Sequence, residues 1–166
     1  MKNYILFTFF FLGSYIINAQ TRIISQDATD IIIVEQGDSQ MDSAIKNAQI
    51  SLTKFDSALC SNNPRYNWFA LKVRFAYGDD NGEHIWFKDI TQKDGEYMGV
   101  VSNEPINIKD ISLNDTILIK RKDISDWMYI DADTLRGGFT IRLLRDRMPQ
   151  NERDEFDASS FYKIEN

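Results

Sequence analysis

The sequence is poor in the residues that build most metal and nucleophilic centres, with one histidine and one cysteine among 166 residues. Zinc sites usually need several Cys or His ligands, so we expect neither a metal ion nor another cofactor. The lone Cys60 cannot form an internal disulfide. It lies at the end of a predicted helix, where we expect a buried, unreactive thiol rather than a nucleophile.

Long apolar runs are absent beyond the N-terminus, and the chain has no repeats and no low-complexity tract. Lys2 precedes a run of aromatic and aliphatic residues from Tyr4 to Ile17, and the small residue Ala19 precedes Gln20. This pattern predicts a cleavable secretory signal peptide over residues 1–19. The run is shorter than the ~20 residues that a membrane-spanning helix needs, which argues against an uncleaved anchor. We therefore expect a periplasmic or secreted protein.

Positive charge is scarce relative to negative charge. The chain has 19 Lys and Arg against 25 Asp and Glu, and loss of residues 1–19 would change its net charge from −6 to −7. An acidic surface repels phosphate backbones and anionic lipid headgroups. We therefore expect no nucleic-acid partner and no membrane association after cleavage, and another protein in the cell envelope is the expected partner.

The chain that remains after cleavage is long enough to bury the core of one domain. Apolar residues recur at intervals of three and four from Met41 to Leu59. This spacing predicts one amphipathic helix of about five turns, capped by Asp38 or Ser39.

Beyond Pro64 the apolar period changes to two, which is typical of half-buried strands. Strands are predicted over residues 71–77, 84–90, 96–102, 116–120 and 125–131, and helices over residues 139–148 and 152–156. Because short turns join successive strands, the strands should pair antiparallel. The expected fold class is α+β: a strongly bent antiparallel sheet of about five strands, a meander or small barrel, with a long N-terminal helix and a C-terminal helix packed on it.

Candidate catalytic side chains centre on His84. A histidine can act as a general base near neutral pH when a carboxylate orients it, and Glu83, Glu104 and Asp126 could supply that carboxylate. Arg142 could hold an anionic group. One histidine without a partner motif is weak evidence for catalysis, and a buried histidine at the start of a strand is the simpler interpretation.

Aromatic residues make up 13% of the chain, a heavy load for so small a domain. Trp68, Trp86 and Trp127 fall in predicted strands or next to them, where a core position is the default. An exposed subset would instead form a recognition surface, because Trp, Tyr and Arg dominate binding hot spots.

Four ordered motifs carry a family resemblance. They are Glu-His-Ile-Trp at residues 83–86, the segment of residues 99–105 that ends in Ser-Asn-Glu-Pro, Ile-Ser-Asp-Trp-Met-Tyr at residues 124–129, and Gly-Phe-Thr-Ile-Arg at residues 138–142. With the helix that begins at Met41, they resemble the YegJ-like family of bacterial proteins, domain of unknown function 2314 (DUF2314), over about residues 40–147. The resemblance implies a small α+β domain in bacteria, often exported, and it implies no established activity, substrate or cofactor.

The family's motif positions form either a shared site or a shared structural network, and the resemblance leaves both open. The positions are Glu83, His84, Trp86, Asn103, Glu104, Pro105, Asp126, Trp127, Thr140 and Arg142.

The sequence thus divides into a signal peptide (1–19), an N-terminal arm (20–38), the YegJ-like domain (39–148) and a short C-terminal helix with a tail (149–166). Within the arm, Ile31 to Val34 predicts a strand or a docked extended segment. The first functional hypothesis is a non-catalytic module that binds a protein or ligand, as an immunity-type inhibitor does. It rests on the missing catalytic set, the acidic charge and the aromatic load. The alternative is a small hydrolase-like enzyme that uses His84 with Glu83 or Glu104.

Overall fold

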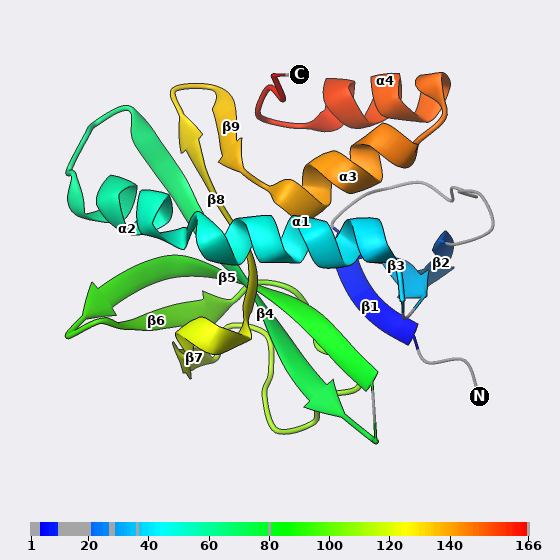
Figure 1. Ribbon diagram of the computed structural model, residues 1–166, viewed down its shortest axis with the longest axis horizontal. Coiled ribbons are helices and arrows are strands. Elements are labelled where there is room, and N and C mark those ends of the chain that lie inside the picture. The colour runs from blue at the N-terminus through cyan, green and yellow to red at the C-terminus, as the bar shows by residue number, and fades with distance from the viewer. Residues whose placement is uncertain (1–3, 10–20, 27–28, 36, 80, 166) are drawn as a thin grey trace.

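The computed structural model describes residues 4–9, 21–26, 29–35, 37–79 and 81–165. Its helices and strands are, in chain order, β1 (Tyr4–Phe9), β2 (Thr21–Gln26), β3 (Thr29–Glu35), α1 (Ser39–Ile50), α2 (Leu52–Cys60), β4 (Tyr66–Tyr77), β5 (Asn81–Lys93), β6 (Glu96–Val101), β7 (Thr116–Ile119), the short 3-10 helix η1 (Arg121–Asp123), β8 (Ile124–Asp131), β9 (Thr134–Gly137), α3 (Phe139–Arg147) and α4 (Gln150–Ser159) (Figure 1).

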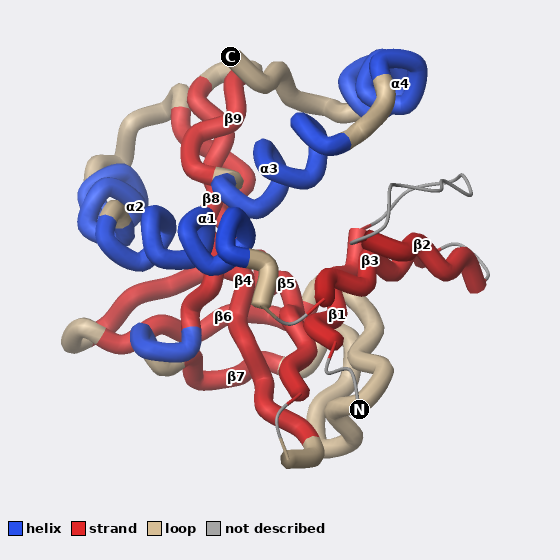
Figure 2. The backbone as a smooth tube through the Cα atoms, turned by 45° about the vertical axis from the view of Figure 1, so that its right-hand side comes forward, coloured by secondary structure: helices blue, strands red, loops and turns tan. Residues whose placement is uncertain are grey.

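An open sheet, in which β4 to β9 pair antiparallel, is the centre of the molecule (Figure 2). Its main path runs β2-β3-β1-β5-β4-β8-β9, and β5 also pairs with β6, which pairs with β7. β5 therefore has two neighbours on one edge: β1 pairs with its first residues and β6 with its later residues. Shifts of register in β4 and β5 mark bulges, which increase the local twist of the sheet.

The larger core lies between the sheet and the helices α1 and α2, which run across it (Figure 1). Alternation along β4 and β5 turns Leu71, Val73, Ile85 and Phe87 toward these helices. Ile124 and Trp127 of β8 join them, because a register shift at Ser125 puts residues three apart on one face. They pack against Leu52 and Phe55 of α2, which are 4% and 0% exposed.

The opposite face of β4, β5 and β8 is also covered, because α3 and α4 return to it. A second apolar cluster there contains Met128, Ile130, Leu135, Ile141 and Phe156, with Trp86 packed beside it. The middle residues of these strands are therefore buried on both faces. A side chain that alternates away from the first core still enters the protein interior.

The α+β fold class and the antiparallel sheet are confirmed. The predicted five-turn helix is instead two helices, α1 and α2, separated at Ser51. The Ser51 hydroxyl donates to the carbonyls of Asn47 (2.6 Å) and Ala48 (3.2 Å), so the side chain competes for backbone acceptors at the break.

Other elements follow their predicted positions with shifted ends. β1, β2 and β9 have no counterpart among the predicted strands, and the apolar run from Ile31 to Val34 forms part of β3. Of the two sheet shapes that were expected, the structure shows an open sheet and not a barrel. The predicted cleavage point after Ala19 lies outside the described residues.

The burial of Leu52 predicts that Leu52→Ala lowers the free energy of unfolding by about 2 to 5 kcal/mol, the usual result of a large-to-small change in a core. Urea denaturation measures the loss. Ile50→Ala is the matched control, because Ile50 is 69% exposed and its replacement should change stability by about 0.5 kcal/mol or less. Equal losses in the two variants would show that α2 does not dock on the sheet as described.

Candidate functional site

A buried polar network lies on the face of the sheet that α3 covers. Lys72 of β4 is opposite Trp86 on β5 and opposite Asp126 on β8, so the three side chains share this face. Lys72, His84, Asp126 and Thr140 each have an exposed fraction of 0%. Ionisable groups are rarely buried so completely unless they are paired, so the partners of each group decide what the network can do.

The Asp126 carboxylate is the acceptor at its centre. Oδ1 accepts hydrogen bonds from the amides of Trp127 (2.8 Å) and Phe139 (3.1 Å). Oδ2 accepts from the amide of Thr140 (2.8 Å) and from its hydroxyl (2.6 Å). Gly138 at the start of α3 has no side chain to cap the helix, so Asp126 satisfies two of its first amides from a neighbouring strand. A negative charge at this end also interacts favourably with the helix dipole.

Lys72 joins this acceptor through Thr140. Its Nζ donates to Thr140 Oγ1 at 2.9 Å and lies 4.8 Å from the centroid of the Trp86 ring. Burial lowers the pKa of Lys72 to about 7, although the Asp126 carboxylate opposes this shift. Burial likewise raises the pKa of Asp126, and Lys72 and the Thr140 donors oppose that change. Four donors around the carboxylate favour its ionised form, so we assign Asp126 as an acceptor and Thr140 as the bridge.

His84 is attached to the same network through Ser125. His84 Nδ1 lies 2.7 Å from Ser125 Oγ, and this hydroxyl donates its proton to the backbone carbonyl of Lys72 (3.2 Å). Because the hydroxyl has one proton, Nδ1 must be protonated and donate to Ser125. Burial lowers the pKa of His84 well below its ordinary value, and the positive charges of Lys72 and Arg74 add to the effect. His84 is therefore a neutral, hydrogen-bonded side chain at pH 7.

Glu83 points to the other face of β5 and anchors the loop after β6. Its carboxylate accepts hydrogen bonds from the amides of Ile106 (2.7 Å), Asn107 (2.7 Å) and Ile108 (3.2 Å). These three donors occupy most of the roughly four acceptor positions of a carboxylate. Glu83 therefore holds a loop in place.

The Asn-Glu-Pro motif forms the start of that loop. Asn103 Oδ1 accepts from the amide of Trp86 at 2.7 Å, which fixes the loop to β5. Pro105 is buried immediately before the amides that bind Glu83, whereas Glu104 is exposed to solvent. The first two family motifs and the loop that follows are thus joined by hydrogen bonds from backbone amides to the side chains of Asn103 and Glu83, and Glu104 does not contribute to them.

Arg142 and Trp127 connect the network to the chain around it. The guanidinium of Arg142 donates to the carbonyls of Gly137 (2.9 Å), Leu135 (2.8 Å) and Glu165 (2.7 Å), so its donors are used by the backbone and not by an anion. Trp127 Nε1 donates to the Ala48 carbonyl at 2.9 Å and links the sheet to α1. Gly137 has φ +73°, and a Cβ there would lie 2.2 Å from the Trp127 carbonyl oxygen, so only glycine fits.

The structure brings His84, Trp86, Asp126 and Thr140 together and leaves Glu104 and Arg142 outside the network. Sequence reasoning missed Lys72, because alternation placed it on the solvent side of a half-buried strand. It also gave Ser125 no role of its own. The signal for Ser125 was its position before Asp126 in a family motif, whereas the alternating strand gave no signal that Lys72 is buried.

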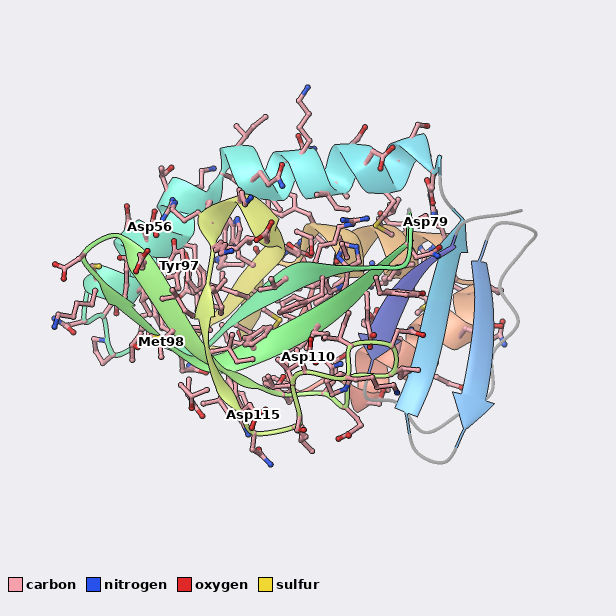
Figure 3. The ribbon with its side chains drawn as sticks, turned by 90° about the horizontal axis from the view of Figure 1, so that it is seen from below. Asp56, Asp79, Tyr97, Met98, Asp110 and Asp115 are labelled. Carbon is pink, nitrogen blue, oxygen red and sulfur yellow. The ribbon has the colours of Figure 1, made fainter. Side chains whose placement is uncertain are left out.

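A second polar cluster joins α2 to β6 (Figure 3). Asp56 accepts hydrogen bonds from the Tyr97 hydroxyl, from Arg121 (2.9 Å to Oδ2) and from Gln92 (3.1 Å). Arg121 also lies over the Tyr97 ring, 5.2 Å from its centroid. Cys60 is nearby on α2 and is exposed, so the prediction of a buried thiol was wrong. It lies at the end of its helix, where the side chain reaches solvent.

No group of three His, Cys, Asp or Glu side chains that could hold a metal ion occurs among the residues that the structure describes. Within the same part of the chain, no helix is long and apolar enough to cross a membrane.

Comparison with known proteins places these motifs in a family. Residues 38–162 match the model of a family described as an uncharacterized protein conserved in bacteria, DUF2314. The chain belongs to this family. It is 35% identical over 135 residues to the uncharacterized protein YegJ of Escherichia coli K12. The aligned residues cover 80% of this chain and 85% of that protein.

A second relative is a putative ankyrin repeat protein of Neisseria meningitidis serogroup B. It is 33% identical over 137 residues, which cover 78% of this chain and 54% of that protein, so the chain spans about half of it. No solved structure matches the chain. The family is therefore established. Three of the four resemblance motifs, at residues 83–86, 124–129 and 138–142, meet in the network, and the second motif is attached beside it through the Asn103 side chain.

The bridge through Thr140 gives a direct test of the network. Thr140→Val keeps the shape of the side chain but removes the hydroxyl, so Lys72 loses an acceptor and Asp126 loses a donor. We expect the free energy of unfolding to fall by about 1.5 to 3 kcal/mol, the range for hydrogen bonds to charged groups. Urea denaturation at pH 7 measures it.

Thr116→Val is the control for this change, because Thr116 is exposed on β7. Its effect should stay within about 0.5 kcal/mol. A Thr140→Val variant as stable as this control would mean that the hydroxyl does not join the two charges.

Proposed function

We propose that this domain is a non-catalytic protein-binding module that acts in the bacterial cell envelope. The observation that supports it is an exposed aromatic pair, Trp68 and Phe161, held on the surface by a strained backbone. Trp68 is 64% exposed and Phe161 is 61% exposed, and their ring centroids are 5.0 Å apart. Two adjacent exposed aromatic rings form an apolar patch on the surface, and such patches mark sites of protein–protein interaction.

The backbone at Trp68 is unusual for a bulky residue. Trp68 lies in a bulge of β4, between Asn67 and Ala70, and its φ is +53°. A left-handed conformation costs about 1 to 2 kcal/mol in a residue with a Cβ. Strain of this kind persists where surrounding structure imposes it and is concentrated at functional sites. Here it turns the indole outward, against Phe161, instead of into the core.

Ion pairs accompany the aromatic pair on the segments that carry it. Arg65 contacts Asp131 at 2.9 Å, Lys163 contacts Asp133 at 2.6 Å, and Arg136 contacts Glu165 at 3.1 Å. An aromatic centre with a polar rim is the usual composition of a protein interface.

The charge of the chain indicates the kind of partner. With a net charge of −6, the domain is best suited to a basic protein, since opposite charge speeds association and selects among partners. An acidic inhibitor that covers a basic toxin or enzyme, as immunity-type proteins do, is one form of such a module. Binding of this kind weakens as salt screens the charges.

The hydrolase-like alternative has less support. Glu83 is occupied by three loop amides, Glu104 is exposed on a different segment, and Arg142 binds backbone carbonyls. A reaction centre needs its acid, base and anion-binding groups around one accessible point. The side chains proposed for those roles point to separate places.

Replacement of Trp68 by a photo-crosslinking phenylalanine derivative in cells should capture one discrete partner, which mass spectrometry identifies. With that partner purified, Trp68→Ala should weaken binding by at least about tenfold in calorimetry, the effect expected of a hot-spot aromatic. The variant should unfold within about 0.5 kcal/mol of the wild type, since the side chain is mostly exposed.

Ile50→Ala is the matched control, because Ile50 is exposed to a similar extent on α1. It should bind the partner as the wild type does. Equal affinity of Trp68→Ala and the wild type, or the same crosslinked product from position 50, would contradict the proposal.

A further inference from the structure

The strand β1 lies within the predicted signal peptide, so cleavage of that peptide would remove β1 from the sheet. β1 lies between β3 and β5: it pairs antiparallel with β3 and parallel with β5, where Ile5 to Phe7 run beside Gly82 to His84 (Figure 1). All of β1 falls within residues 1–19, the predicted signal peptide. Cleavage after Ala19 would therefore remove a strand from the interior of the sheet.

Removal of β1 exposes two strand edges that face each other. Over residues 82–84, β5 loses its neighbour on one side, at a point where Gly82, Glu83 and His84 are buried in the full-length chain. β3 loses the strand that separates it from β5. Backbone N–H and C=O groups that are buried without hydrogen bonds are costly, and a bare strand edge pairs readily with another strand.

We propose that β3 takes the place of β1 beside β5 in the processed protein. β3 already has the required direction, because it is antiparallel to β1 and β1 is parallel to β5. It needs to move by one strand spacing, about 4.8 Å, without turning over. Its sequence is suited to an interior position, since Ile31 to Val34 are all β-branched.

The present pairing predicts the register of the new pair. Phe7 is beside Ile32 on one side and His84 on the other, Leu6 is beside Ile33 and Glu83, and Ile5 is beside Val34 and Gly82. Closure without slippage places Ile32 opposite His84 and Val34 opposite Gly82. Slippage by one residue would exchange the two faces of β3, so the register is a specific expectation.

In the processed protein, the sheet is thus completed by the chain's own β3. The short connection between β3 and α1 makes β3 the strand that pairs with β5. β3 ends at Glu35 and α1 begins at Ser39, so β3 stays close to the free edge of β5. The inference rests on the predicted cleavage and is independent of the proposed binding function.

The test uses the full chain, isotope-labelled, exported by cells and recovered from the envelope in its processed form. An intact mass about 2 kDa below that of the full chain establishes that residues 1–19 are gone. NMR then measures cross-strand contacts and amide exchange. We expect nuclear Overhauser contacts between Ile32 and His84 and between Val34 and Gly82, with amides in residues 82–84 exchanging at least about 100-fold more slowly than in an unfolded chain.

Three results would overturn the inference. The first is an intact mass that retains the leader. The second is a processed protein without these contacts, whose amides at residues 82–84 exchange rapidly. The third is contacts at residues 82–84 that arise between molecules in a mixed-label sample, which would assign the edge to a second copy. Loss of partner binding by Trp68→Ala would be unaffected by any of these results.

Discussion

The burial of the Asp126 carboxylate is the constraint on which the rest of this domain depends. A carboxylate without exposed surface is tolerated only when donors surround it, and Asp126 receives them from Trp127 on its own strand and from Phe139 and Thr140 at the start of α3. The turn between β9 and α3 must therefore place α3 directly over β8. Gly137 permits that turn, since any side chain there would collide with Trp127.

The same constraint gives three of the four family motifs a common physical role. The first motif supplies His84, which binds Ser125 of the third, and Lys72 bridges to the fourth through Thr140. A buried charge pair of this kind is weak evidence for stability, because well-packed apolar residues often serve as well, whereas removal of one partner is strongly destabilising. We interpret the network as a device that selects one arrangement of strands and α3.

The sequence predicts the elements well where a single period governs them, and it fails where tertiary structure decides. Alternation located β4, β5 and β8, and their antiparallel pairing followed from short turns. Alternation also made Lys72 appear solvent-facing, because nothing in one strand reveals that α3 and α4 cover the second face. The apolar stripe that continues past Ser51 predicted one helix, but hydrogen bonds from that hydroxyl mark a break. The outward turn of Trp68 depends on a bulge that no local pattern announces.

The charge state of His84 tests most directly the claim that the motif residues form a structural network and not a reaction centre. Its folded-state pKa lies below the unfolded value of about 6.5, so the unfolded chain binds more protons below that pH and stability falls as the pH drops through this window. As the chain has one histidine, nitrogen NMR reports its ring without ambiguity. We predict a neutral ring protonated at Nδ1, with shifts that stay constant from about pH 8 to about pH 5. A ring that titrates with a pKa of about 6.5 or higher would contradict the account, because it would describe an accessible base.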